Sequence, residues 1–113
     1  MRIAIKVSPR RFVLFDAEEI YYLQSDGHDT WVRTARRTRV RSVRSLGQLE
    51  KILKPHGFVR VHKSYLVNLD RVREVRLRKG DDNDWELKLD PPVNSVLPVG
   101  REHLAGLRRV LGF

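Results

Sequence analysis

The stretch GFVRVHKSYLVN, residues 57–68, decides how this 113-residue sequence is interpreted. Two apolar runs, Phe58–Val61 and Tyr65–Val67, flank the polar triplet His62–Ser64. Short runs rich in β-branched and aromatic residues, separated by a few polar residues, are typical of paired strands. The stretch therefore predicts two strands joined by a polar turn. We also expect Asn68 to cap the turn that follows through its side chain.

Strand patterns continue on both sides of this stretch. The dipeptide Asp26-Gly27 is a strong hairpin signal between two further runs. Pro98 lacks an amide hydrogen, so its run is expected at the edge of a sheet. The predicted strands outside residues 57–68 are Ile3–Val7, Phe12–Phe15, Ile20–Leu23, Thr30–Thr34, Arg37–Arg41, Val72–Leu77, Trp85–Leu89 and Ser95–Val99.

Two short helices interrupt the strands. Ser45 with Gln48 three residues later forms a capping-box pattern, and Pro55 ends the first helix. The apolar positions repeat at helical spacing in both segments. They are Leu46, Leu49, Ile52 and Leu53 in the first, and Leu104, Leu107, Val110 and Leu111 in the second. Because no repeat, low-complexity tract or linker divides the chain, residues 1–113 are predicted to form one mainly β domain.

The composition favours an anionic partner. Lys and Arg number 23 against 14 Asp and Glu, which gives a net charge of +9 and a pI near 10.6. A pI above about 9 is typical of nucleic-acid-binding domains, although an acidic protein or a membrane surface would also suit this charge. The absence of cysteine excludes disulfides, thiolate metal sites and cysteine nucleophiles. No apolar run reaches the ~18 residues of a membrane span, so we expect a soluble, cytoplasmic protein.

Catalytic and metal-binding motifs are weak in this sequence. The four histidines lack HExxH-like spacing, and neither a glycine-rich phosphate loop nor a nucleophile elbow is present. His28 lies near Asp26 and Asp29, but such a cluster is more often a polar loop than a ligand set. Asp81, Asp82 and Asp84 lack the glycine and glutamate spacing of a calcium loop and predict a solvated hairpin tip. We expect no enzymatic activity, no cofactor and no metal.

The basic residues gather on predicted strands and loops rather than along one helix. This distribution argues against a helix-turn-helix. Trp31, Tyr65 and Trp85 lie within apolar alternation and are expected in the core, which argues against an RNA-stacking surface. The groups are Arg33, Arg36, Arg37, Arg39, Arg41 and Arg44; Arg60, His62 and Lys63; Arg71, Arg73, Arg76, Arg78 and Lys79, expected to be a solvated face; and Arg101, Arg108 and Arg109.

Three blocks of the sequence resemble LytTR-type DNA-binding domains. Residues 57–68 resemble the family's GF-x-R-x-H-[RK]-S-[YF]-LVN signature. Asp16–Leu23 resembles its acidic-Ile-aromatic strand, and Leu97–Arg101 its lPVSR segment. The resemblance covers essentially the whole chain. It implies about ten short strands in small antiparallel sheets with one or two short helices. It also implies that loops enter successive major grooves, and that two copies occupy a direct repeat.

The resemblance places candidate DNA contacts in three loops. The first holds His28, Asp29 and Thr30, where an Asn-Tyr pair is common in the family. The second holds His62 and Lys63, with Ser64 as a phosphate ligand. The third holds Arg101 after Gly100, which stands where the family usually has Ser; the glycine would lose a phosphate contact but free an amide at a helix start. Arg101 suits bidentate bonds to guanine, and Lys63 suits a base acceptor or a phosphate. Arg60 is either a phosphate clamp or part of a structural salt bridge.

The sequence therefore predicts a transcriptional regulator domain that binds duplex DNA sequence-specifically through loops at strand ends. A homodimer on DNA and an upstream receiver or sensor domain are the further partners that the resemblance implies, although no such second domain fits within 113 residues. The alternatives are a basic module that binds an acidic protein or a membrane face, and an RNA-binding β domain. Loss of sequence preference on replacing Lys63 or Arg101 would favour DNA.

Overall fold

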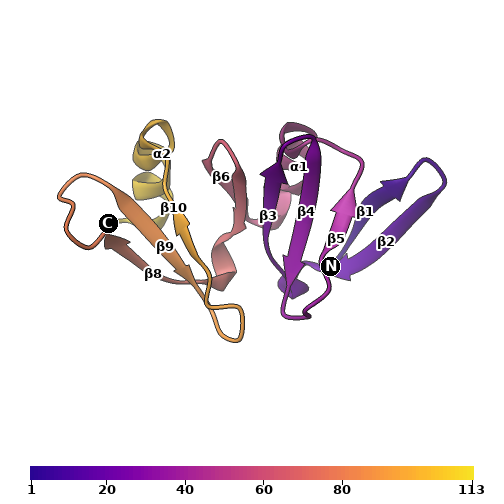
Figure 1. Ribbon diagram of the computed structural model, residues 1–113, viewed down its shortest axis with the longest axis horizontal. Coiled ribbons are helices and arrows are strands. Elements are labelled where there is room, and N and C mark those ends of the chain that lie inside the picture. Colours follow the sequence, from indigo (N-terminus) through magenta and orange to yellow (C-terminus); the bar gives the residue numbers. More distant parts are fainter.

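The computed structural model describes residues 1–113 as ten strands in three antiparallel sheets with two α-helices (Figure 1). This architecture confirms the predicted fold class. The strands are β1 (Arg2–Ser8), β2 (Arg11–Asp16), β3 (Ile20–Asp26), β4 (Asp29–Thr34), β5 (Val40–Ser42), β6 (Phe58–His62), β7 (Tyr65–Asn68), β8 (Val72–Leu77), β9 (Trp85–Leu89) and β10 (Val96–Pro98). The helices are α1 (Leu46–Leu53) and α2 (Arg101–Leu111), and 3-10 turns span Ala17–Glu19, Lys54–His56 and Leu69–Arg71.

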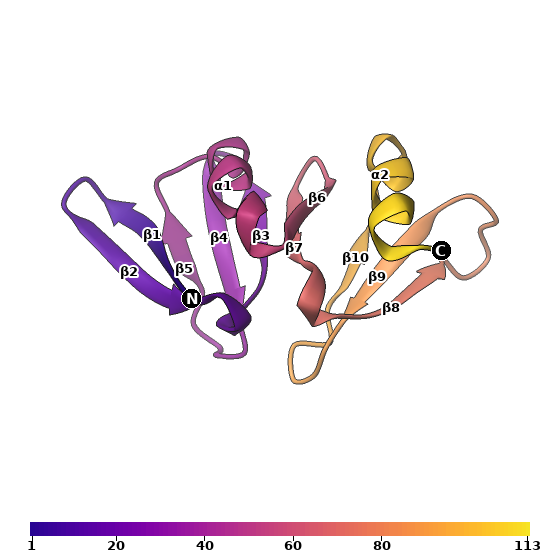
Figure 2. The ribbon, with the colours of Figure 1, turned by 180° about the vertical axis from the view of Figure 1, so that it is seen from behind.

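The central sheet, with strand order β5-β4-β3-β7-β6, is covered on both faces. Leu23 and Leu66 belong to a cluster of 11 buried residues that includes the apolar side chains of α1 and β1. Tyr22 and Val67 belong to a second cluster of nine, with residues from β9, β10 and α2. Because successive side chains on a strand point to opposite faces, β3 and β7 support both clusters. The small sheets β1-β2 and β10-β9-β8 lie at the two ends of the molecule (Figures 1 and 2).

A bulge explains the apolar run Ile20–Leu23. The register of β3 against β4 shifts between Ile20 and Tyr22, so one extra residue is accommodated there. A bulge re-aims the side chains beside it. Tyr21 and Tyr22 consequently both face the second cluster, while Ile20 and Leu23 face the first.

Local signals that depend on a few neighbours are confirmed. The Ser45 Oγ accepts a hydrogen bond from the Gln48 amide at 3.2 Å, and the Gln48 side chain accepts one from the Ser45 amide at 2.9 Å. The Asn68 side chain accepts from the Asp70 amide at 3.1 Å, as predicted. Strand β10, which contains Pro98, lies at the edge of its sheet.

Other expectations are wrong in detail. Residues 35–39 form a loop, and only Val40–Ser42 pair as β5, so most of the predicted strand Arg37–Arg41 is loop. Ile52, Val110 and Leu111 are exposed, because each lies off the face of its helix that packs inward. The aromatic residues Trp31, Tyr65 and Trp85 are half-buried rather than core: Tyr65 and Trp85 pack against the second cluster, and the Trp31 ring lies 4.5 Å from the Arg39 guanidinium.

The turns predicted to contact DNA lie along one long edge of the molecule. The β3–β4 turn, the β6–β7 turn and the start of α2 all lie along the upper edge in Figure 1. The view from behind in Figure 2 shows the same arrangement. The β4–β5 and β9–β10 loops lie at the opposite edge. No helix in the chain has the length and apolar character required to span a membrane.

Candidate nucleic-acid interface

Backbone hydrogen bonds tie the three turns to one another. The Ser25 amide at the end of β3 donates to the Ser64 carbonyl in the β6–β7 turn at 2.9 Å. The Gly100 amide before α2 donates to the Val61 carbonyl in β6 at 2.7 Å. The β6–β7 turn is thus the middle member of a connected edge. The backbones of the three turns therefore keep fixed positions relative to one another.

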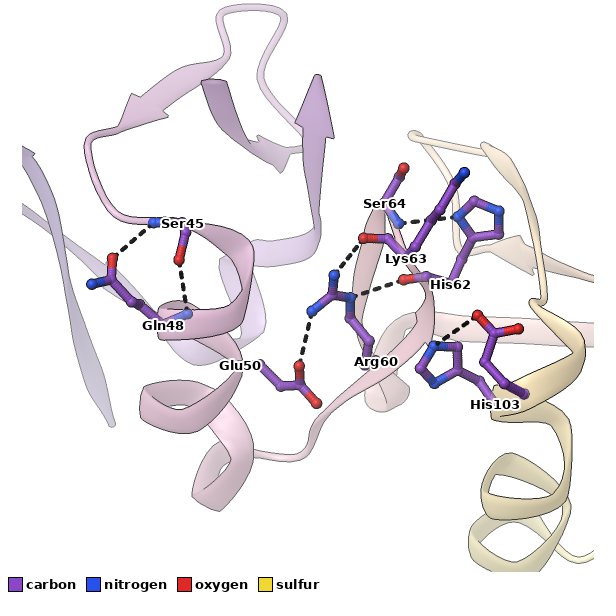
Figure 3. A network of polar contacts seen from close by, with 9 residues as sticks. Ser45, Gln48, Glu50, Arg60, His62, Lys63, Ser64 and His103 are labelled. Carbon is purple, nitrogen blue, oxygen red and sulfur yellow. Dashed lines mark hydrogen bonds and ion pairs between the residues drawn. The ribbon is translucent and has the colours of Figure 1, made fainter. Parts of the chain in front are cut away.

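Arg60 shapes the β6–β7 turn from below. Its Nε donates to the His62 carbonyl at 2.9 Å, and its Nη2 donates to the Lys63 carbonyl (Figure 3). Its Nη1 donates to Glu50 Oε1 of α1 at 2.9 Å, and the Arg60 side chain is 20% exposed. Of the two roles that the sequence left open, the structure shows the salt bridge. The guanidinium holds the turn and connects it to α1.

His62 makes its contacts within the same turn. Its Nδ1 accepts a hydrogen bond from the Ser64 amide at 3.0 Å, and its ring lies 5.5 Å from the Tyr65 ring. Burial lowers the His62 pKa below 6.5, and the positive charge of Lys63 lowers it further. The imidazole is therefore neutral at neutral pH, and because Nδ1 accepts, the proton lies on Nε2. The next residue, Lys63, has an exposed side chain.

The β3–β4 turn differs from its neighbour in having few contacts of its own. Gly27 and His28 are its two central residues, and Gly27 has φ +61. His28 is exposed, and Asp29 pairs with Arg41 at 3.3 Å. Thr30, in contrast, is 3% exposed, because it pairs with both Ser25 and Ser42 inside the sheet. The side chain of Thr30 is therefore buried in the sheet, and the expectation that this residue lies near DNA stays a prediction.

The start of α2 forms the third turn. Gly100 is the N-cap residue, and no side chain caps the helix. The expectation that the Gly100 amide is free is wrong, because it donates to Val61. Arg101 is 75% exposed, and its Nε donates to Asp84 Oδ1 of the β8–β9 hairpin at 3.2 Å. A cavity of about 500 Å³, lined in part by His62 and Arg101, lies between the second and third turns.

Asp84 is the site residue that sequence reasoning missed. The sequence predicts it as part of a solvated acidic tip, and its separation of 17 residues from Arg101 gives no local signal of the contact. The remaining basic groups are partly occupied within the fold. Arg73 pairs with Asp90, Arg76 pairs with Glu74 and Glu86, and Arg71 donates to the Glu18 carbonyl. No group of three or more His, Asp or Glu side chains is arranged to hold a metal ion.

Comparison with known proteins identifies the family. The family model for the LytTr DNA-binding domain matches residues 10–112. The CO-responsive transcriptional regulator RcoM of Rhodospirillum rubrum is 35% identical over 96 residues, which cover 85% of this chain and 39% of that protein. The transcriptional regulatory protein YpdB of Escherichia coli is 28% identical over 105 residues, 93% of this chain and 41% of that protein. The chain thus spans about two fifths of the length of these relatives.

A solved structure shows the same fold. The LytTr DNA-binding domain of a putative methyl-accepting/DNA response regulator from Bacillus cereus superposes with a TM-score of 0.77 and 20% identity. The match covers 99% of this chain and 97% of that one. The family match and the fold confirm the resemblance carried by residues 57–68, and the chain belongs to the LytTR family of DNA-binding domains found in transcriptional regulators.

Proposed function

We propose that this domain binds duplex DNA sequence-specifically through the β3–β4 turn, the β6–β7 turn and the start of α2. The observation that carries the proposal is the pair of backbone hydrogen bonds that fix these turns relative to one another, Ser25 to Ser64 and Gly100 to Val61. Direct readout needs side chains held in register with base edges, which connected turns supply. The net charge of +9 adds attraction to phosphates.

Each turn offers a different chemistry. Lys63 supplies an exposed ammonium for a base acceptor or a phosphate, and neutral His62 supplies an Nε2–H donor. Arg101 supplies two guanidinium nitrogens, Nη1 and Nη2, that have no partner within the chain, and this pair suits guanine O6 and N7. His28 and Asp29 in the first turn are exposed or half-exposed donors and acceptors. Ser64 offers a hydroxyl for a phosphate.

The shape of the molecule fits this role. Its longest dimension is 47 Å, and the three turns follow one another along the central part of that direction in Figure 1. One helical turn of B-DNA is about 34 Å long. Entry of the turns into successive major grooves is part of the proposal. The occupation of a direct repeat by two copies belongs to the same proposal.

A receiver or sensor domain as regulatory partner also stays a proposal. Similar proteins include a CO-responsive transcriptional regulator and a response regulatory protein, and this chain spans about two fifths of their length. A signal received by such a partner would act on the DNA-binding edge.

Selection of bound sequences from a random duplex library tests the proposal. We expect the protein to recover a short recurring motif, and we expect affinity for that duplex to fall steeply between about 50 and 200 mM salt. Lys63→Ala and Arg101→Ala should each erase the preference at specific positions of the motif. Arg109→Ala removes an exposed arginine from the far end of α2 and serves as the control that lowers affinity uniformly.

Three outcomes would contradict the proposal. The library could yield no motif, the two variants could recover the parent motif unchanged, or single-stranded RNA could compete better than duplex DNA. The last result would favour the RNA-binding alternative. Binding that depends only on the charge of the partner would favour a module for acidic proteins or membranes.

A further inference from the structure

The tip of the β8–β9 hairpin places acidic residues next to a surface expected to meet DNA. Asp81, Asp82 and Asp84 follow one another within four positions, and carboxylates beside phosphates oppose binding. Attraction to DNA alone therefore does not explain why this tip is acidic. Its hydrogen bonds show that it is a built turn rather than a loose solvated loop.

Asp81 organises the tip. Its Oδ1 accepts hydrogen bonds from the Asn83 amide at 2.8 Å and from the Asp84 amide at 3.2 Å. The Asn83 amide hydrogen bond lowers the Asp81 pKa, so this carboxylate stays ionised and keeps accepting. The Arg78 amide donates to the Asp84 carbonyl at 2.7 Å and closes the hairpin. The backbone of Asp84 is consequently held at both its amide and its carbonyl.

The carboxylate of Asp84 reaches one atom of Arg101. The Nε of Arg101 lies 3.2 Å from Asp84 Oδ1, and the Asp84 side chain is 34% exposed while that of Arg101 is 75% exposed. A contact through Nε leaves the end-on fork of the guanidinium, Nη1 and Nη2, without a partner within the chain, and this fork has bidentate geometry. The two nitrogens suited to guanine are therefore the two that the chain leaves open.

We propose that Asp84 is a positioning residue that orients the guanidinium of Arg101 and thereby sets the guanine preference of the third turn. This inference rests on the proposed function. An unrestrained arginine at 75% exposure samples many rotamers, and a single Nε contact removes much of that freedom before DNA arrives. The carboxylate also disfavours pairing of this segment with backbone phosphates, because like charges repel. Asp84 thus lowers the general affinity for DNA and raises discrimination at one base.

The hairpin offers a matched control for this role. Asp82 is an exposed carboxylate on the same tip and makes no hydrogen bond or ion pair within the chain. Asp82→Ala and Asp84→Ala therefore remove the same charge from the same tip, and only the second removes the contact with Arg101. Asp84→Asn keeps an oxygen that accepts from Nε without the charge, so it is the conservative variant.

The experiment repeats the duplex-library selection with the parent, Asp82→Ala, Asp84→Ala, Asp84→Asn, Arg101→Ala and the Asp84→Ala/Arg101→Ala double variant. We expect Arg101→Ala to erase a guanine at one position of the motif. Asp84→Ala should weaken the preference at that same guanine by roughly five- to 100-fold, the range of one bidentate contact. Asp84→Asn should retain part of it, Asp82→Ala should leave it unchanged, and the double variant should match Arg101→Ala.

Affinity for a scrambled duplex gives a second readout. If Asp84 only stabilised the fold, its loss would not raise this affinity. Asp84→Ala should bind the scrambled duplex more tightly than the parent, as Asp82→Ala should, because each loses a carboxylate. Full guanine preference in Asp84→Ala would overturn the inference and leave the proposed function intact. Equal loss in Asp82→Ala would overturn it as well, because the charge and not the contact would then matter. A parent protein that recovers no motif would overturn both.

Discussion

The β6–β7 turn and the β3–β4 turn lie side by side on the proposed DNA edge, yet they are held in different ways. Both are flanked by an arginine that pairs with a carboxylate, Arg60 with Glu50 at 2.9 Å and Arg41 with Asp29 at 3.3 Å. Arg60 is 20% exposed and also binds two carbonyls of its turn, whereas Arg41 is 57% exposed and binds only the carboxylate. Arg60 is part of the scaffold, and Arg41 lies on the surface.

This difference separates two sources of turn geometry. The geometry of the β3–β4 turn is set by its own backbone, because Gly27 at φ +61 suits a tight hairpin. In the β6–β7 turn a distant helix takes part, because Glu50 of α1 holds the guanidinium that holds the turn (Figure 3). The middle turn is therefore coupled to α1, whereas the tip of the first turn, at Gly27 and His28, is shaped by its own backbone.

Replacing Arg60 is expected to have the largest effect. Arg60→Ala leaves the His62 and Lys63 carbonyls without their donor and Glu50 without its partner, so we expect a loss of about 2 kcal/mol in the free energy of unfolding. Duplex affinity should fall roughly tenfold as the turn loses its preorganised shape. Urea unfolding followed by tryptophan fluorescence and duplex titration measure the two effects.

Arg60→Lys is the control for this prediction. It keeps the positive charge but lacks the planar fork that reaches two carbonyls and a carboxylate together. We expect it to bind duplex DNA nearly as poorly as Arg60→Ala. Recovery of the parent affinity by the lysine variant would show that Arg60 acts through its charge on phosphates and not by shaping the turn.

The same contrast explains which features the sequence predicts. The Ser45 cap, the Asp26-Gly27 hairpin and the edge position of Pro98 depend on a few neighbouring residues, and the structure confirms each of them. The Arg101–Asp84 pair and the burial of Thr30 depend on which elements become neighbours in space. Hydrophobic periodicity predicts strands but not their order in a sheet. It therefore predicts neither the Arg101–Asp84 pair nor the burial of Thr30.

The pH dependence of stability sharpens the comparison further, with an effect expected to be smaller. Because the pKa of His62 is lowered in the folded protein, the neutral imidazole is favoured there. The stability that this provides is fully present above about pH 6.5, the ordinary pKa of histidine, and is lost as the pH falls toward the lower folded value. His62→Asn, which keeps an acceptor for the Ser64 amide, should lose less stability than the parent between pH 7 and pH 5 in urea unfolding. Parallel losses in the two proteins would show that His62 does not supply this dependence.

The smallest effect is expected at Arg41. Arg41→Ala breaks an ion pair whose side chains are 57% and 46% exposed, and water and salt screen such pairs. We expect the free energy of unfolding to change by less than about 0.5 kcal/mol, and the duplex-binding motif to keep its preference at positions read by the β6–β7 turn. Urea unfolding of Arg41→Ala beside Arg60→Ala measures the difference directly. A loss of unfolding free energy in Arg41→Ala as large as that in Arg60→Ala would contradict this contrast. It would mean that the arginine, and not the backbone alone, also fixes the geometry of the first turn.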